Sequence, residues 1–115
     1  MVPFATFWQR LKEDLDTCPL VGGNHAKRVQ KWSAARGDMD GEFLVLWSGG
    51  DVLLCNTERD NAPRTISRAE FEKVYAVWQD YTAGAKGRSY LAHDLGVQNC
   101  TWVIPILYRH QHLMH

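Results

Sequence analysis

The chain has 115 residues, with thirteen basic and thirteen acidic side chains and a formal net charge of zero. This length allows one compact domain, 1–115, and 45% apolar with 23% charged residues is the balance of an ordinary globular protein. A net charge of zero excludes any overall electrostatic attraction to nucleic acid or to an anionic membrane.

The beginning of the chain lacks the basic start and the long apolar run of a signal peptide. The longest apolar run, 102–108, is far shorter than a membrane span. Three cysteines without paired spacing, Cys18, Cys55 and Cys100, fit reduced thiols better than a disulfide scaffold. We therefore expect a cytoplasmic protein with no membrane partner.

Residues 4–16 have the spacing of an amphipathic helix. Apolar side chains recur at steps of three and four along one face: Phe4, Phe7, Trp8, Leu11 and Leu15. The segments Cys18-Pro19 and Gly22-Gly23 then end the helix and form a loop.

Residues 25–36 leave two alternatives. Asn24 is a suitable helix cap and Gly37 a suitable helix stop, but Lys27 and Arg28 oppose the dipole at a helix start. We favour a strand over 27–35, followed by a turn into the next segment.

Residues 43–55 predict two short strands joined by Gly49-Gly50. A hairpin with one wet face alternates apolar with polar residues, whereas here both faces are apolar. In the first strand Phe43, Val45 and Trp47 share one face, and Leu44 and Leu46 share the other. Both faces should therefore be covered, either by helices of the same chain or by a second copy of it.

Residues 67–82 predict a helix whose start is marked by two devices. Ser67 and Glu70 have the spacing of a capping box, and Ile66 and Phe71 that of a hydrophobic staple. Gly84 is available to end the helix.

A short helix is expected over 89–95, and a strand over 101–109. In the latter, Pro105 disfavours a helix and points to an edge strand or a bulge. The predicted fold is α+β: a small antiparallel sheet of three or four strands packed with two or three helices.

The residues that carry chemistry form no complete constellation. Histidine is a common metal ligand, and His110, His112 and His115 stand close together at the end of the sequence. No second cluster of possible ligands lies nearby in the sequence, so a frayed polar tail is the plainer interpretation. The spacing between Cys18 and His25 does not indicate a catalytic nucleophile and its base. We therefore predict no catalytic residue, no metal site and no cofactor.

Three of the five tryptophans lie on predicted strands, where they line either the core or a binding surface. The first hypothesis is a non-enzymatic binding or interaction module that self-associates and holds a small apolar molecule or a protein partner. Its site would be an aromatic pocket or interface formed by Trp32, Trp47, Trp102 and Tyr108.

Basic residues support a second hypothesis, a DNA-associated accessory protein, although such clusters are also common on solvated faces. Its contact residues would be Lys27, Arg28, Lys31, Arg64, Arg68, Arg88 and Ser89. Two further basic residues, Arg36 and Lys86, lie within the same clusters. An enzyme of unknown type comes third, because no constellation meets the needs of acid–base or metal chemistry.

Residues 89–102 resemble the helix-turn-helix of bacterial DNA-binding proteins, with Ala92, Gly96, Val97 and Trp102 at its small, turn and apolar positions. The apolar run 103–107 departs from that motif, in which a recognition helix is polar. More broadly, 28–109 resembles small bacterial proteins and appended domains, some of which accompany restriction or HNH-type nucleases or travel on mobile gene cassettes. The pattern lies in 28–32, 43–57, 66–84 and 99–107, and it implies a fold without a mechanism.

Overall fold

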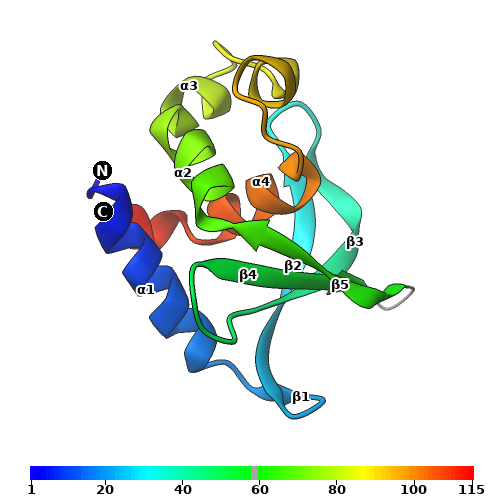
Figure 1. Ribbon diagram of the computed structural model, residues 1–115. Helices are drawn as coiled ribbons and strands as arrows, with labels where there is room; N and C mark the ends of the chain where they lie inside the picture. The colour runs from blue at the N-terminus through cyan, green and yellow to red at the C-terminus, as the bar shows by residue number, and fades with distance from the viewer. Residues whose placement is uncertain (58–59) are drawn as a thin grey trace.

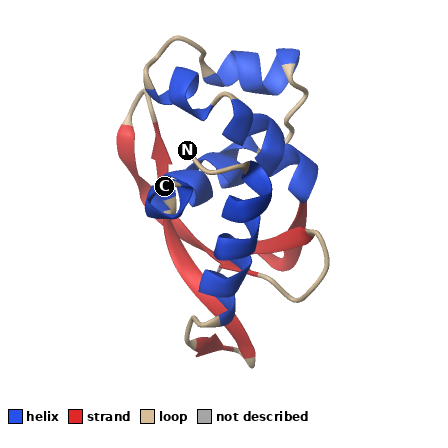
Figure 2. Cartoon of the chain, turned by 90° about the vertical axis from the view of Figure 1, so that its left-hand side faces the viewer, coloured by secondary structure: helices blue, strands red, loops and turns tan. Residues whose placement is uncertain are grey.

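The computed structural model describes residues 1–57 and 60–115, which form a sheet with helices stacked on one face (Figures 1 and 2). Five antiparallel strands follow one another across the sheet in chain order. The elements are α1 (Phe4–Asp16), β1 (Leu20–Val21), β2 (Asn24–Ser33), β3 (Gly37–Leu46), β4 (Val52–Thr57), β5 (Asp60–Ser67), α2 (Arg68–Ala76), α3 (Trp78–Thr82), the π-helical turn η1 (Tyr90–Asp94), α4 (Cys100–Arg109) and the 3-10 turn η2 (Gln111–Met114). The α+β class is confirmed, but the described residues form more strands and helices than we expected.

Helix α1 has the bounds that its apolar spacing predicts, and its buried side chains are the five that define that spacing. Phe4 and Phe7 lie 5.4 and 5.0 Å from the ring of Tyr75, and Trp8 lies 5.3 Å from Phe71. Aromatic pairs of this kind each add about 0.5–1.5 kcal/mol beyond the area they bury. These contacts therefore fix α1 against α2.

The segment 25–36 holds a strand rather than a helix: β2 ends at Ser33, where residues 34–36 form a turn, and it pairs with β3 from Ala26 to Ser33. The turn between them reaches Gly37, whose φ of +72° lies in the left-handed region that favours glycine. This turn forms one wall of the cleft described below.

The hairpin of β3 and β4 presents one apolar face to the helices and the other away from them. The inner face holds the fully buried members of both strands: Phe43, Val45, Leu53 and Cys55. The outer face holds half-buried members: Leu44, Leu46, Val52 and Leu54. Figures 1 and 2 show the helices gathered on the inner side, so the described helices cover one of the two faces, and the apolar side chains of the other face are only partly exposed.

The predicted helix over 67–82 is interrupted at Val77, where φ of −116° and ψ of 17° leave the helical range. Helix α2 ends before this residue and α3 begins after it, so that Trp78 and Tyr81 pack against Trp32 of β2. Gly84 ends α3 with a φ of +81°, as predicted.

Glu70 caps a different helix from the one that the sequence indicates. Ser67 precedes α2 without a side-chain capping bond, so the predicted capping box is wrong. The Glu70 carboxylate instead accepts hydrogen bonds from the backbone N–H groups of Gln98 and Asn99 at 2.9 and 3.1 Å, and from the Asn99 side-chain amide at 2.8 Å. These donors lie at the start of α4, where unpaired N–H groups and the helix dipole favour a negative charge.

The segment 101–109 is not a strand but lies within α4. Val103 through Leu107 are all buried, because neighbouring elements enclose this helix. A helix buried all round is apolar all round, and by pattern alone it resembles a strand buried on both faces. Pro105 lies inside this helix although it removes one backbone hydrogen bond and its ring crowds the carbonyl of Thr101, because the burial of the residues around it offsets that cost. Among the described residues no helix has the length and apolarity that crossing a bilayer requires.

The C-terminal segment is ordered rather than frayed. Met114 is 1% exposed, and its carbonyl accepts a hydrogen bond from the N–H of Val2 at 2.7 Å. The Arg10 guanidinium donates to the carbonyls of Leu113 and His115 at 3.1 and 2.8 Å. The two ends of the chain therefore lie together, as the N and C marks in Figure 1 show.

Candidate functional site

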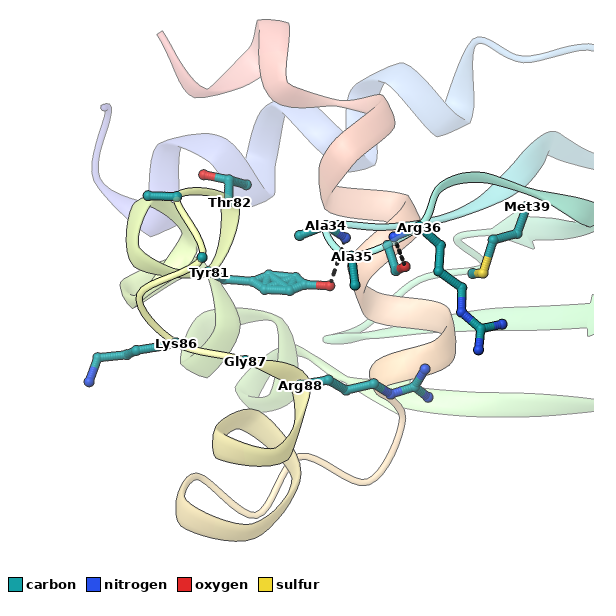
Figure 3. A pocket seen from close by; sticks show the side chains of 12 residues that line it. Ala34, Ala35, Arg36, Met39, Tyr81, Thr82, Lys86, Gly87 and Arg88 are labelled. Carbon is teal, nitrogen blue, oxygen red and sulfur yellow. Dashed lines mark hydrogen bonds between the residues drawn. The ribbon is translucent and has the colours of Figure 1, made fainter.

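A cleft of about 720 Å³ opens between the β2–β3 turn and the loop that follows α3. Residues 33–36 and 39 form one wall, and residues 81–84 and 86–88 form the other (Figure 3). This volume lies within the range of sites that hold small molecules. The two walls are about fifty residues apart in sequence, so the cleft exists only in the folded chain.

The charged side chains of the cleft are all cationic. Figure 3 shows Arg36 and Arg88 extending toward the same end of the cleft and Lys86 toward the opposite end. The Arg88 guanidinium donates to the hydroxyl of Thr101 in α4, which anchors it, and the Lys86 ammonium lies 4.1 Å from the centroid of the Tyr90 ring. Among the described residues that line the cleft there is no Asp or Glu, so its own walls do not neutralise this charge.

Between its charged ends the cleft is lined by small or apolar side chains: Ala34, Ala35, Met39 and Ala83. Tyr81 is 3% exposed, and its hydroxyl accepts a hydrogen bond from the N–H of Ala34 at 3.1 Å. A phenolic hydroxyl that accepts one hydrogen bond still has a proton to donate. The cleft therefore combines an apolar middle with a polar hydroxyl and cationic ends.

Two of the four predicted aromatic site residues lie together beside the cleft. Trp32 and Tyr108 stack with their ring centroids 3.7 Å apart and their planes 9° apart. Trp32 also meets the ring of Tyr81 edge-on at 6.5 Å, and it directly precedes Ser33 of the cleft wall. A ligand in the cleft would therefore change the surroundings of Trp32.

The other two predicted aromatic residues make different contacts. Trp102 meets the ring of Phe43 edge-on at 4.9 Å. Trp47 lies 5.3 Å from the ammonium group of Lys12, and its indole donates to the carbonyl of Gly50 at 2.9 Å. None of the four aromatic residues lines the cleft, so an aromatic-lined pocket stays a prediction.

The residues predicted to bind nucleic acid are divided among several surroundings. Arg88 lines the cleft, Arg64 donates to the side chain of Asn99 at 3.3 Å, and Arg68 lies 5.5 Å from the ring of Phe4. The others lie on β2 or directly before η1: Lys27, Arg28, Lys31 and Ser89. Arg64 and Arg88 thus each donate to a side chain at the start of α4, Arg64 to that of Asn99 and Arg88 to that of Thr101.

Lys27 belongs to a partly buried cluster rather than to a free basic surface. Its ammonium donates to the carboxylate of Asp14 at 2.9 Å and to Nε2 of His110 at 3.0 Å. Nδ1 of His110 lies 2.6 Å from the carbonyl of Ile106, and because a carbonyl only accepts, Nδ1 carries the ring proton. Burial and the Lys27 charge lower the pKa of His110 to about 4. Partial burial raises the pKa of Asp14, but the hydrogen bond from Lys27 and the charges of Lys27, His110 and His112 together lower this pKa below its usual value.

The thiols lack the partners that activate a nucleophile. Nδ1 of His25 lies 2.5 Å from the carbonyl oxygen of Cys18, whose thiol itself donates to the carbonyl of Asp14 at 3.3 Å. Burial raises the pKa of Cys18, and it raises that of Cys55 to about 12. Over the described ranges, no three His, Cys, Asp or Glu side chains are grouped to hold a metal ion.

The helix-turn-helix resemblance has a counterpart in η1 and α4, which are separated by a turn at Gly96 with a φ of +70°. The second helix of this pair is the buried helix α4, so it is not free to enter a DNA groove. Comparison of the chain with protein-family models, with curated proteins and with solved structures finds no match.

Two residues of the cleft, Arg36 and Lys86, were part of separate basic clusters in the sequence and were not among the predicted contact residues. Their relation to Arg88 depends on the packing of α3 against β2, which no spacing in the sequence reveals. The sequence holds one signal of a cationic cleft, because no acidic residue lies between 25 and 36 or between 81 and 88.

Proposed function

We propose that the protein is a non-enzymatic binding module whose cleft holds a small phosphate-bearing ligand with a planar apolar body. The observation that carries this proposal is that Arg36 and Arg88 extend to one end of a cleft without acidic side chains. A guanidinium presents a planar fork of N–H donors that matches phosphate geometry, and two of them can hold one anion from both sides.

The rest of the cleft supports the same ligand class. Its apolar middle suits a flat body such as a nucleobase, and the Tyr81 hydroxyl can donate one orienting hydrogen bond. Lys86 at the opposite end offers a second, weaker anion contact. The described lining has no carboxylate, imidazole or thiol, the usual groups for proton transfer or nucleophilic attack near neutral pH, and this favours binding over catalysis.

Calorimetric titration with three probes tests the ligand class. We expect ATP to bind most tightly, pyrophosphate less tightly and adenosine least, because only ATP carries both phosphates and a planar body. Binding of ATP should also change the tryptophan fluorescence, and W32F should remove most of that change because Trp32 contacts Tyr81 of the cleft wall. The absence of heat and of a fluorescence change with all three probes at millimolar concentration would refute the proposal.

Variants of two cleft residues test whether ATP binds in the cleft. R36Q and R88Q should each weaken ATP binding about tenfold, the equivalent of 1.4 kcal/mol for one lost charged hydrogen-bonding group. Lys73→Gln removes an exposed charge from α2 outside the cleft and should leave the affinity within a factor of two. An equal effect of all three variants would indicate unspecific attraction between ATP and positive charge.

DNA binding is a second candidate, and it is favoured because Arg64 and Arg88 both extend to side chains at the start of α4. It predicts retention of short duplex DNA that weakens steeply with salt and is lost in the variant R64E/R88E. Retention of DNA without binding of ATP would select this candidate over the small-ligand module, and no retention at low salt would exclude it.

A further inference from the structure

Two hydroxyl groups of the cleft each accept a hydrogen bond from the backbone of the β2–β3 turn. The Tyr81 hydroxyl accepts from the N–H of Ala34 at 3.1 Å, and the Ser33 hydroxyl accepts from the N–H of Arg36 at 3.2 Å. Within the part of the chain that the structure describes, neither hydroxyl donates to a protein acceptor. Each of them therefore has a proton left to donate to a bound molecule.

The other side chains of the cleft offer few acceptors. The described lining consists otherwise of alanine, glycine and cationic residues, apart from Met39 and Thr82. The Thr82 hydroxyl donates its proton to carbonyls of its own helix, those of Trp78 and Gln79 at 3.1 and 3.2 Å, and the thioether of Met39 is a weak acceptor. The side chains of the cleft thus supply mainly hydrogen-bond donors, which suit a ligand that presents acceptors.

We infer that the planar body of the ligand turns a carbonyl oxygen toward Tyr81, so that the cleft prefers oxo nucleobases, such as hypoxanthine and uracil, over amino nucleobases, such as adenine and cytosine. This inference rests on the proposed function of the cleft. Figure 3 shows the Tyr81 ring extending from the α3 wall toward Ala34 and Ala35, between the charged ends of the cleft. A phenol that has accepted one hydrogen bond meets a carbonyl with its proton, whereas an amino group brings a second donor that the phenol oxygen accepts poorly.

The Tyr81 ring is held in place by two other rings. Its centroid lies 5.6 Å from that of Trp78 and 6.5 Å from that of Trp32, which it meets edge-on. The hydrogen bond from Ala34 then fixes the position of the hydroxyl oxygen. A donor fixed in this way discriminates between ligands, because it cannot turn away from a group that leaves it unpaired.

Ser33 has a different part in this arrangement. Its hydroxyl is bonded to the backbone of Arg36, the residue whose guanidinium we assign to the phosphate together with that of Arg88. We therefore assign the Ser33 proton to a phosphate oxygen, a contact that every nucleotide offers. Tyr81 then selects the base, and Ser33 contributes to the affinity for all nucleotides alike.

Calorimetric titration with two pairs of nucleotides tests the inference on the wild-type protein. ITP carries an oxo group where ATP carries an amino group, and UTP differs from CTP in the same way. We expect the oxo member of each pair to bind roughly five- to tenfold more tightly, the ratio that one neutral hydrogen bond supports. Equal affinities within both pairs, or tighter binding of the amino members, would overturn the inference.

Two variants separate base selection from a structural role of the hydroxyl. Y81F should lower the affinity for ITP to that for ATP and so remove the preference. S33A is the matched control, because it also removes a hydroxyl that accepts an N–H of the turn; it should weaken ITP and ATP by the same factor and keep the preference. A preference that survives in Y81F overturns the inference.

The same titrations distinguish failure of this inference from failure of the proposed function. If ITP and ATP bind equally and R36Q weakens both, the base preference is wrong and the phosphate-binding cleft stands. If none of the four nucleotides binds at millimolar concentration, both are wrong.

Discussion

Replacing Glu70 with alanine should destabilise the protein although the side chain is neither in the core nor at the candidate site. The carboxylate accepts three hydrogen bonds from Gln98 and Asn99 at the start of α4. A hydrogen bond to a charged group contributes about 1.5–3 kcal/mol, and a lost helix cap alone costs roughly 0.5–2 kcal/mol. Because Glu70 and Asn99 are half-buried, we expect E70A to lower the free energy of unfolding by about 2–3 kcal/mol in total.

Urea denaturation followed by circular dichroism measures this loss, which corresponds to a fall of roughly 10 °C in Tm for a chain of this size. Glu72→Ala removes an exposed carboxylate from the same helix and should cost less than about 0.5 kcal/mol. Ser67→Ala should be equally mild, because the Ser67 side chain makes no capping bond. The reasoning is refuted if E70A costs no more than Glu72→Ala, or if Ser67→Ala is the more damaging change.

Three further outcomes follow from buried or strained groups. The imidazole of an unfolded chain titrates near 6.5, whereas folded His110 stays neutral to about 4, so the unfolded state binds the proton first. Stability should therefore fall as the pH drops from 6.5 to 4, by roughly 3 kcal/mol, and denaturation curves of H110Q should show a smaller fall. Mass spectrometry after brief treatment with a thiol reagent should find Cys18 modified before Cys55, which is 1% exposed; equal rates would contradict the burial. G96A should cost about 1 kcal/mol by thermal denaturation because its φ is +70°, whereas Gly87→Ala, where φ is not positive and no atom lies within 4 Å of the added Cβ, should cost less.

The elements that follow one clear periodicity could be predicted from the sequence. Helix α1 has the predicted bounds because its apolar residues fall on one face, and the β3–β4 hairpin follows from Gly49-Gly50 between two apolar runs. Gly84 ends its helix as predicted because a left-handed residue there favours glycine. These features depend on residues that are close together in the sequence, so the sequence alone is enough to predict them.

Features decided by tertiary contacts could not be predicted. The segment 103–107 is apolar on every side, so its periodicity does not distinguish a helix from a strand, and only enclosure by the other elements resolves it. Glu70 has the spacing of a cap for its own helix, yet it meets the donors of Asn99 only after α2 and α4 have packed together. The cleft likewise needs Arg36 and Arg88 to be brought together from distant segments. In each case the deciding partner lies far along the chain.

The enclosure of α4 has a consequence for how the protein loses its structure. A helix at the rim of a fold can detach and return while the remainder stays intact, but α4 packs against β2 from the first half of the chain and against α2 from the second half. Releasing α4 would strip the apolar lining from each of those elements at once. Detachment of this helix and collapse of the whole fold are therefore one cooperative event, and amide protons along it should exchange with solvent no faster than global unfolding permits.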